Sequence, residues 1–311
     1  MAPKAIITEV SDVNNISFHP LTVDDRQSIQ DVTLYAGRRN CNYTFANLVG
    51  WQFWFNTEVC VLKDAVVLRF NINGERAYMV CTAREVSTDL LMSLLDDSGG
   101  KLTLFGLEDS QAESLSLPKS DFEIAIEPRR NQFDYIYLRS DLATLHGGKL
   151  KAKRNHVNRF LAEYPHFVYQ PLIPEFFEQC RLLTDKWQED RDSDETIVAE
   201  RRAMETVFAH WDALDMIGGC IFIDGRMVAF TYGAAVTTDT IDVCVEKADR
   251  NVDGAFSIIN QQFAEHLPDQ FVYVNREEDM GLPGLRKAKM SYHPKILLSC
   301  NIVKITRHKT I

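Results

Sequence analysis

The clearest alternation of hydrophobic and polar residues lies in the second half of the chain. Three apolar segments are separated there by turn residues, and they predict antiparallel strands at 217–223, 227–235 and 240–247. The turn Asp224-Gly225 tolerates the positive φ angles of a two-residue hairpin. Apolar residues at helical spacing follow from Phe256 to Leu267. The predicted order is therefore strand, strand, strand, helix.

The third of these strands has one apolar and one polar face. Ile241, Val243 and Val245 alternate with three polar positions, Asp242, Cys244 and Glu246. Because Glu246 stands near the carboxyl end of the strand, we expect its carboxylate to face away from the hydrophobic side.

The first half of the chain shows the same order of elements. A helix is predicted at 24–35, strands at 59–62, 65–71 and 77–81, a helix at 87–95 and a strand at 102–105. A Pro-Leu pair precedes the first helix of each half, at 20–21 and 171–172. The match is in element order and not in side chains, so we expect two copies of one fold with the active site in the second copy.

Length and composition restrict the class of protein. A chain of 311 residues favours two domains, which we place at 1–145, without catalytic function, and 146–311, with the active site. The net charge of -10 disfavours nucleic-acid binding over the whole surface. The seven cysteines lack CxxC spacing and the eight histidines lack ligand spacing, so we expect reduced thiols and no metal site.

The hydropathy pattern gives no sign of a membrane segment. The chain has no uninterrupted apolar run of the about 18 residues that a span requires, and its first residues lack the apolar run of a signal peptide. We therefore expect a cytoplasmic protein without integral membrane association. The sequence leaves the oligomeric state open.

A basic segment at 149–159 stands out against this acidic background. Lys149, Lys153 and Arg154 could bind the phosphates of a tRNA, a nucleotide or a lipid head group. The alternative is a solvated helix face that balances the charge of an acidic protein.

Residues 250–255 connect the third strand to the helix and resemble, in part, the acyl-donor motif of the GCN5-related N-acetyltransferase (GNAT) superfamily. Arg250 and Ala255 fit the motif, and Asp253 and Gly254 stand between them. Asp253 replaces the first glycine of the motif. We expect Asp253 to cap the helix, where its carboxylate would occupy the free N–H groups and repel a phosphate.

A loop dense in charge follows the apolar segment 271–274. Glu277 and Asp279 are candidates to hold an α-ammonium group, and Arg286 and Lys289 are candidates to hold a phosphate or carboxylate. Residues Asn275 and Arg276 complete this candidate substrate site. The alternative is a loop and helix held together by salt bridges.

Acyl transfer needs a base for the attacking group and an acid for the leaving group. Glu246 is the candidate base, with a surface ion pair to Lys247 or Arg250 as the alternative role. Tyr292 or His293 is the candidate acid.

Three segments together carry a family resemblance: YLRSDLATLHGGKLKAKRNHVNRFLAEYP, VEKAD and YVNREEDMGLPGLRKAKMSYHP. They resemble the bacterial domain-of-unknown-function family that is related to the C-terminal catalytic domain of phosphatidylglycerol lysyltransferase. That family is similar to the Fem-type peptidoglycan transferases and to leucyl/phenylalanyl-tRNA protein transferase.

The resemblance implies an α+β tandem acyl-CoA N-acyltransferase (GNAT-like) fold with two mixed, mostly antiparallel sheets flanked by helices. It also implies that the third and fourth strands of the second copy part beside Glu246 and Asn275, and we expect only this copy to part its sheet. The implied reaction moves an aminoacyl group from aminoacyl-tRNA, or an acyl group from acyl-CoA, to an amine or hydroxyl, with no tightly bound cofactor. The alternative is a non-catalytic module that binds an amino acid or nucleotide.

Overall fold

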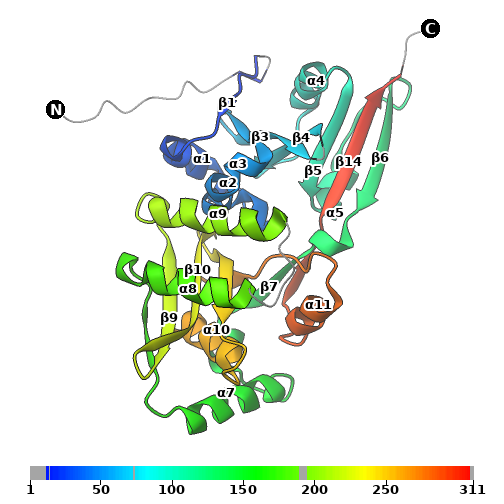
Figure 1. Ribbon diagram of the computed structural model, residues 1–311. Coiled ribbons are helices and arrows are strands. Elements are labelled where there is room, and N and C mark those ends of the chain that lie inside the picture. Colours follow the sequence, from blue (N-terminus) through cyan, green and yellow to red (C-terminus); the bar gives the residue numbers. More distant parts are fainter. Residues whose placement is uncertain (1–11, 14, 73, 189–194, 309–311) are drawn as a thin grey trace, which may run out of the picture. The chain divides into compact units, whose positions relative to one another are not determined.

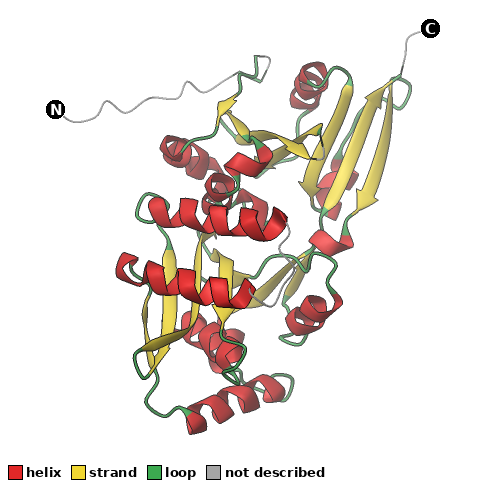
Figure 2. Ribbon diagram, viewed as in Figure 1, coloured by secondary structure: helices red, strands yellow, loops and turns green. Residues whose placement is uncertain are grey.

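The computed structural model describes residues 12–13, 15–72, 74–188 and 195–308, and the chain forms two compact units (Figure 1). Unit 1 consists of residues 1–38, 51–130 and 299–311, and unit 2 of residues 39–50 and 131–298. Each unit contains one seven-stranded sheet with helices packed on it (Figure 2). Across the described residues, every helix is too short or too polar to span a bilayer.

The sheet of unit 1 has the strand order β1-β2-β3-β4-β5-β14-β6, and β4 and β5 are its parallel neighbours. Its apolar core lies between the sheet and the leucine-rich face of α4. The strands are β1 (His19–Pro20), β2 (Glu58–Val61), β3 (Ala65–Ile72), β4 (Glu75–Thr82), β5 (Lys101–Leu107), β6 (Phe122–Pro128) and β14 (Asn301–Arg307). The helices are α1 (Arg26–Thr33), α3 (Gln52–Phe55), α4 (Thr88–Asp97) and α5 (Asp109–Ser114).

The sheet of unit 2 has the order β13-β7-β12-β11-β10-β9-β8, and β11 and β12 are its parallel neighbours. The strands are β7 (Asp134–Leu138), β8 (Val168–Pro171), β9 (Ile217–Ile223), β10 (Arg226–Thr237), β11 (Thr240–Ala248), β12 (Tyr273–Asn275) and β13 (Ile296–Leu298). The helices are α2 (Phe45–Gly50), α6 (Arg139–Thr144), α7 (Lys151–Glu163), α8 (Phe177–Gln188), α9 (Glu195–Ala209), α10 (Ala255–His266) and α11 (Pro283–Met290).

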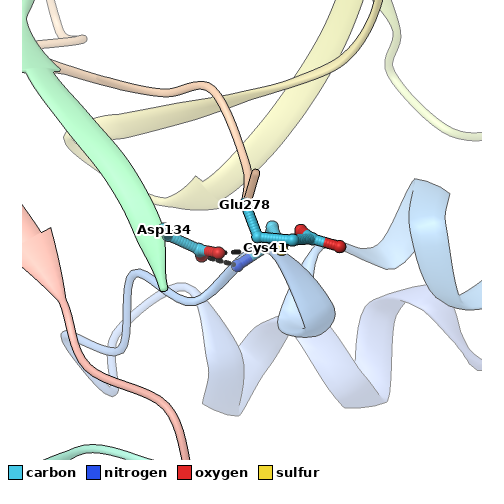
Figure 3. Close-up of side chains that lie close together, drawn as sticks. All are labelled: Cys41, Asp134 and Glu278. Atoms are coloured by element: carbon cyan, nitrogen blue, oxygen red, sulfur yellow. Dashed lines mark hydrogen bonds between the residues drawn. The ribbon is translucent and has the colours of Figure 1, made fainter. Parts of the chain in front are cut away.

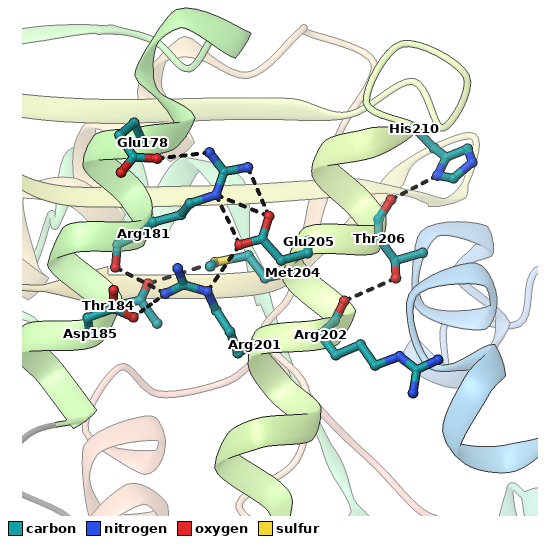
Figure 4. Close-up of polar contacts among 10 residues, drawn as sticks. All are labelled: Glu178, Arg181, Thr184, Asp185, Arg201, Arg202, Met204, Glu205, Thr206 and His210. Carbon is teal, nitrogen blue, oxygen red and sulfur yellow. Dashed lines mark hydrogen bonds and ion pairs between the residues drawn. The ribbon is translucent and has the colours of Figure 1, made fainter.

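Charged side chains join helices α8 and α9 (Figure 4). Arg181 of α8 donates to both carboxylate oxygens of Glu205 of α9, at 2.8 to 3.1 Å. The same two helices are in contact through Phe177 and Phe208, whose stacked rings have centroids 4.0 Å apart. Helix α8 continues to Gln188, and residues 189–194 lie outside the described part of the chain.

The units are not consecutive halves of the chain, in contrast to the predicted boundary between residues 145 and 146. β14, the last strand, pairs with both β5 and β6 in unit 1, where it is drawn in red in Figure 1. β7 pairs with β12 and β13 in unit 2, and residues 39–50 also belong to that unit. Pairing between strands distant in sequence decides this division, and local hydropathy does not record it.

The parallel strands part in both units. In unit 1, β4 and β5 meet at one register pair, Tyr78 with Leu104. Beyond it, Arg38 donates to the carbonyl of Thr82 at 2.9 Å and lies 3.7 Å from the carboxylate of Glu108. The expectation that only the second copy parts its sheet is therefore wrong, and a side chain of unit 1 occupies the corresponding place.

A β-bulge in β11 changes the direction of Glu246. Tyr232 of β10 pairs with Val245 while Gly233 pairs with Val243, so Cys244 is an additional residue in β11. Past the bulge, Glu246 accepts a hydrogen bond from Asn260 of α10 at 3.3 Å. Glu246 thus points toward the helix that packs on the apolar core, and the predicted orientation is wrong because the alternation is interrupted.

The bulge requires a glycine at position 233. A Cβ atom there would lie 2.0 Å from the carbonyl oxygen of Asp242. We expect Gly233→Ala to lower the free energy of unfolding by roughly 2–4 kcal/mol, since the rigid backbone must move. Urea unfolding measures this change. As a control, Gly284→Ala in α11 adds a methyl group where no atom lies within 4 Å and should leave stability equal or slightly higher, so equal losses in both variants would contradict this account.

Candidate functional site

The candidate site lies where β11 and β12 part in unit 2. The two strands form three parallel register pairs, from Thr240 with Tyr273 to Asp242 with Asn275. β11 then continues to Ala248, whereas the chain after Asn275 enters a loop. Lys247 bonds Glu200 of α9 and Glu246 bonds Asn260 of α10, so these two helices cover opposite faces of β11.

A pocket of about 290 Å³ lies at the N-terminal end of α10. Lys153 and His156 of α7 line it from one side, and Asp249, Arg250 and residues 252–257 line it from the other. Basic side chains and a helix N-terminus both favour a negatively charged group. The pocket therefore suits a phosphate or carboxylate.

The N-terminus of α10 is not capped by Asp253, in contrast to our expectation. Gly254 is the N-cap residue, with a φ of 82°, and no side chain caps the helix. Asp253 instead pairs with Arg159 of α7, with 2.6 Å between the carboxylate and the guanidinium, and this bond lowers its pKa. The difference arises because Gly254 allows close approach of α7, since a Cβ there would lie 2.8 Å from the carbonyl oxygen of His156.

The three basic residues predicted at the start of α7 have different surroundings. Lys153 lines the pocket, and its ammonium lies 4.3 Å from the centre of the Tyr292 ring. Arg154 donates to the backbone carbonyls of Leu145 and Gly147, so it holds the preceding loop. Lys149 is exposed outside the pocket.

Glu246 and Arg276 form an ion pair at the opening. Their charged groups are 2.8 Å apart, and their side chains are 12% and 14% exposed. Both carboxylate oxygens of Glu246 accept hydrogen bonds, one from Arg276 and one from Asn260. Nη1 of Arg276 is buried without a hydrogen-bond partner in the described structure. Arg276 is thus fixed by Glu246 and keeps one donor available.

Tyr292 connects this ion pair to the pocket. The ring is buried, and Arg276 lies 4.9 Å from its centre. Burial raises the pKa of Tyr292, while Arg276 and a hydrogen bond with Ser257 oppose the rise. Ser257 lines the pocket. The phenol thus stands, protonated, between the pocket and the guanidinium.

Other residues of the predicted substrate site bond one another or the backbone. Asp279 is buried and accepts two hydrogen bonds from Arg286, at 2.8 and 2.9 Å, and one from Tyr135 at 2.6 Å. Lys289 donates to the backbone carbonyls of Arg276 and Glu278. Asn275 is fully buried and donates to Asp134 at 2.8 Å. These four predicted site residues hold the loop after β12 in place.

An acidic cluster that the sequence did not reveal lies at the end of β12, on the side of residues 39–50. Asp242 accepts hydrogen bonds from Thr44 and Asn47, and Asn47 also donates to Glu277 at 3.0 Å. Burial and neighbouring carboxylates raise the pKa of Asp242 and Glu277. The cluster consists of Cys41, Asp134, Asp242, Cys244, Glu277 and Glu278.

Part of this cluster joins Cys41 to Asp134 and Glu278 (Figure 3). The thiol of Cys41 lies 3.3 Å from Asp134 and 3.7 Å from Glu278. Burial and the carboxylate of Glu278 raise the pKa of Asp134 to about 6. No local signal could have placed Cys41 here, because it comes from the first half of the chain.

The chain is similar to several known proteins and solved structures. A family model described as "Phosphatidylglycerol lysyltransferase, C-terminal" matches residues 35–300. A conserved protein of unknown function from Bacteroides thetaiotaomicron is 37% identical, with a TM-score of 0.89 over 94% of this chain and 100% of that chain.

Two further matches are more distant in sequence. The C-terminal domain (DUF2156) of a protein from Agrobacterium fabrum, described as "Putative Lysylphosphatidylglycerol Synthetase", has a TM-score of 0.59 at 12% identity, over 90% of this chain and 92% of that chain. An uncharacterized protein from Mycoplasmoides gallisepticum is 22% identical over 205 residues, which are 64% of this chain and 64% of that protein's length. The predicted α+β, tandem GNAT-like fold is confirmed.

The turn between β11 and α10 depends on Asp249, which provides a test by pH. Burial alone would raise the pKa of Asp249, but hydrogen bonds from Arg226 and Lys186 outweigh it and lower the pKa from 3.8 to about 2. Because the folded-state pKa lies below the unfolded one, the stabilisation is complete above pH about 5 and is lost as pH falls toward 2.

We expect Asp249→Asn to reduce the free energy of unfolding by roughly 2 kcal/mol at pH 7, with the difference from the wild type shrinking below pH about 4. Urea unfolding at a series of pH values measures it. Asp269→Asn, at a fully exposed partner of Arg139, should change little at any pH. A difference for Asp249→Asn that stays constant down to pH about 2 would contradict the assignment.

Proposed function

Because the chain belongs to the family of the C-terminal domain of phosphatidylglycerol lysyltransferase, we propose that it transfers an aminoacyl group from aminoacyl-tRNA to an amine or hydroxyl acceptor. The observation that carries this proposal is one continuous set of contacts. It leads from the pocket at α10 through Ser257 and Tyr292 to Arg276 and Glu246 in the opening.

The donor phosphate binds in the pocket at the N-terminus of α10. Lys153 and His156 supply basic groups there, and Asp253 is held by Arg159. A volume of about 290 Å³ suits a terminal nucleotide better than a complete coenzyme A. The exposed basic residues Lys149 and Lys151 lie just before α7 and at its first position, where they are suited to the further phosphates of an RNA.

Arg276 stabilises the oxyanion that develops on the aminoacyl carbonyl. Its Nη1 is buried and has no partner in the described structure, and a charged donor in a site screened from water favours a developing negative charge. Glu246 positions Arg276 and does not act as the base that the sequence suggested. Both of its carboxylate oxygens already accept hydrogen bonds.

Lys153 stays positively charged at the donor phosphate, and the acceptor releases its own proton to the surrounding water as it attacks the carbonyl. Tyr292 stays protonated and donates to the leaving 3′ oxygen of the tRNA. The ester bond to the ribose breaks, and a new amide or ester bond forms to the acceptor.

The role of Arg276 predicts the kinetics of a conservative variant. Arg276→Lys keeps the charge but lacks the second donor, so kcat should fall by roughly 10²-fold with little change in KM. Transfer of a labelled aminoacyl group from charged tRNA to a panel of amines and hydroxyls measures both constants. Arg76→Lys, at an exposed position of unit 1, is the matched control and should keep full activity. Equal activity of the two variants would exclude this role.

The choice of donor predicts a competition experiment. Lys153→Gln should weaken binding of charged tRNA about tenfold and reduce its dependence on salt, because one phosphate contact is lost. Lys304→Gln, at an ion pair with Glu127 in unit 1, should not. If acyl-CoA binds through Lys153 while charged tRNA does not bind, the donor is acyl-CoA and the tRNA proposal is wrong.

A further inference from the structure

The acidic cluster of unit 2 contains more negative groups than its surroundings balance. Four carboxylates and two thiols meet there, from residues 39–50, β7, β11 and the loop after β12. The ammonium of Lys289 only partly offsets the raised pKa of Asp242 and Glu277, and it donates hydrogen bonds to the backbone carbonyls of Arg276 and Glu278. Buried carboxylates are stable when they are paired, protonated or bound to a metal ion.

We propose that Asp242, Cys244 and Glu277 form a binding site for one Zn²⁺ ion. One ligand atom from each of these residues lies within 4.8 Å of the others. The two strand residues are two positions apart and therefore lie on the same face of β11, and the thiol lies 3.8 Å from Oδ2 of Asp242. The site is independent of the proposed transfer reaction.

An unpartnered buried oxygen gives separate support. Asp242 is 0% exposed, and its Oδ1 has no hydrogen-bond partner in the described structure. Such an oxygen is costly to bury unless a cation or donor reaches it. Its other oxygen, Oδ2, accepts from Thr44 and Asn47, at 2.8 and 2.9 Å. These bonds orient the carboxylate as outer partners orient metal ligands.

The neighbouring set of Cys41, Asp134 and Glu278 is a weaker candidate (Figure 3). Both oxygens of Asp134 already accept hydrogen bonds from Cys41, and Asn275 donates to one of them as well. Cys41 is also buried, whereas Cys244 is partly exposed and leaves a route for an ion to enter.

The donor set selects the metal. One thiolate with two carboxylates suits Zn²⁺ better than Mg²⁺ or Ca²⁺, which bind oxygen ligands. Typical bonds of about 2.3 Å to sulfur and about 2.0 Å to oxygen place sulfur and oxygen roughly 3.5 Å apart in a tetrahedron. The ligand atoms of the three residues lie within 4.8 Å of one another, so the set must close by roughly 1 Å to bind the ion. Three protein ligands leave the fourth position for water.

The test uses the full chain, stripped of metal with a chelator and titrated with Zn²⁺ against a chromogenic chelator. We expect one Zn²⁺ per chain, and at least about tenfold weaker binding in Cys244→Ser and in Asp242→Asn. Substitution of Co²⁺ should give the near-ultraviolet absorption of a cobalt–thiolate bond. This band should be absent in Cys244→Ser, and circular dichroism shows whether each variant is folded.

Two thiol variants provide the controls. Cys180→Ser removes a buried thiol of α8 that contacts Met227, and Cys41→Ser removes the thiol of the neighbouring set. Both should retain one Zn²⁺ and the cobalt–thiolate band. Loss of the band in Cys41→Ser with retention in Cys244→Ser would overturn the assignment. Absence of stoichiometric Zn²⁺ binding by the wild type would overturn the site.

Discussion

The parting of β11 and β12 is the constraint on which the rest of unit 2 depends. The two strands share three register pairs and then part, so the edge of β11 beyond Asp242 faces side chains in place of a neighbouring strand. Arg276 is the first residue of the loop after β12, and its ion pair with Glu246 bridges the opening. The loop itself is held by Asp279, Arg286 and Lys289, which keep Arg276 in position.

The two faces of β11 carry different sites because of the bulge at Cys244. On the face of α10, Glu246 meets Arg276, with Lys153 beyond Tyr292. On the other face, Asp242 meets the residues of the acidic cluster. A regular strand would place Asp242 and Glu246 on the same face. The additional residue therefore separates a basic site, suited to phosphate and oxyanion, from an acidic site, suited to a cation.

The two copies of the fold share the order of their elements and differ in their side chains. In unit 1, helix α4 follows strand β4. Ser87 caps this helix and accepts a hydrogen bond from the backbone N–H of Leu90 at 3.2 Å. In unit 2 the corresponding N-cap is Gly254, which has no side chain to occupy the helix donors. Arg38 further occupies the place where β4 and β5 part. The same scaffold thus leaves the N-terminal donors of this helix uncapped by a side chain in unit 2, whereas Ser87 caps them in unit 1.

The sequence by itself determined the order of the elements, since each strand of the meanders and helices α4 and α10 follows from local alternation and spacing. It also brought Glu246, Arg276, Tyr292 and Lys153 forward as candidates. Only the tertiary structure decided the partners: Glu246 with Arg276, Asp253 with Arg159, and Asp279 with Arg286.

It also decided that β14 belongs to unit 1 and Cys41 to unit 2. The physical reason is that hydropathy periodicity reports which face of an element is buried, whereas ion pairs, bulges and strand pairing depend on residues far apart in the chain.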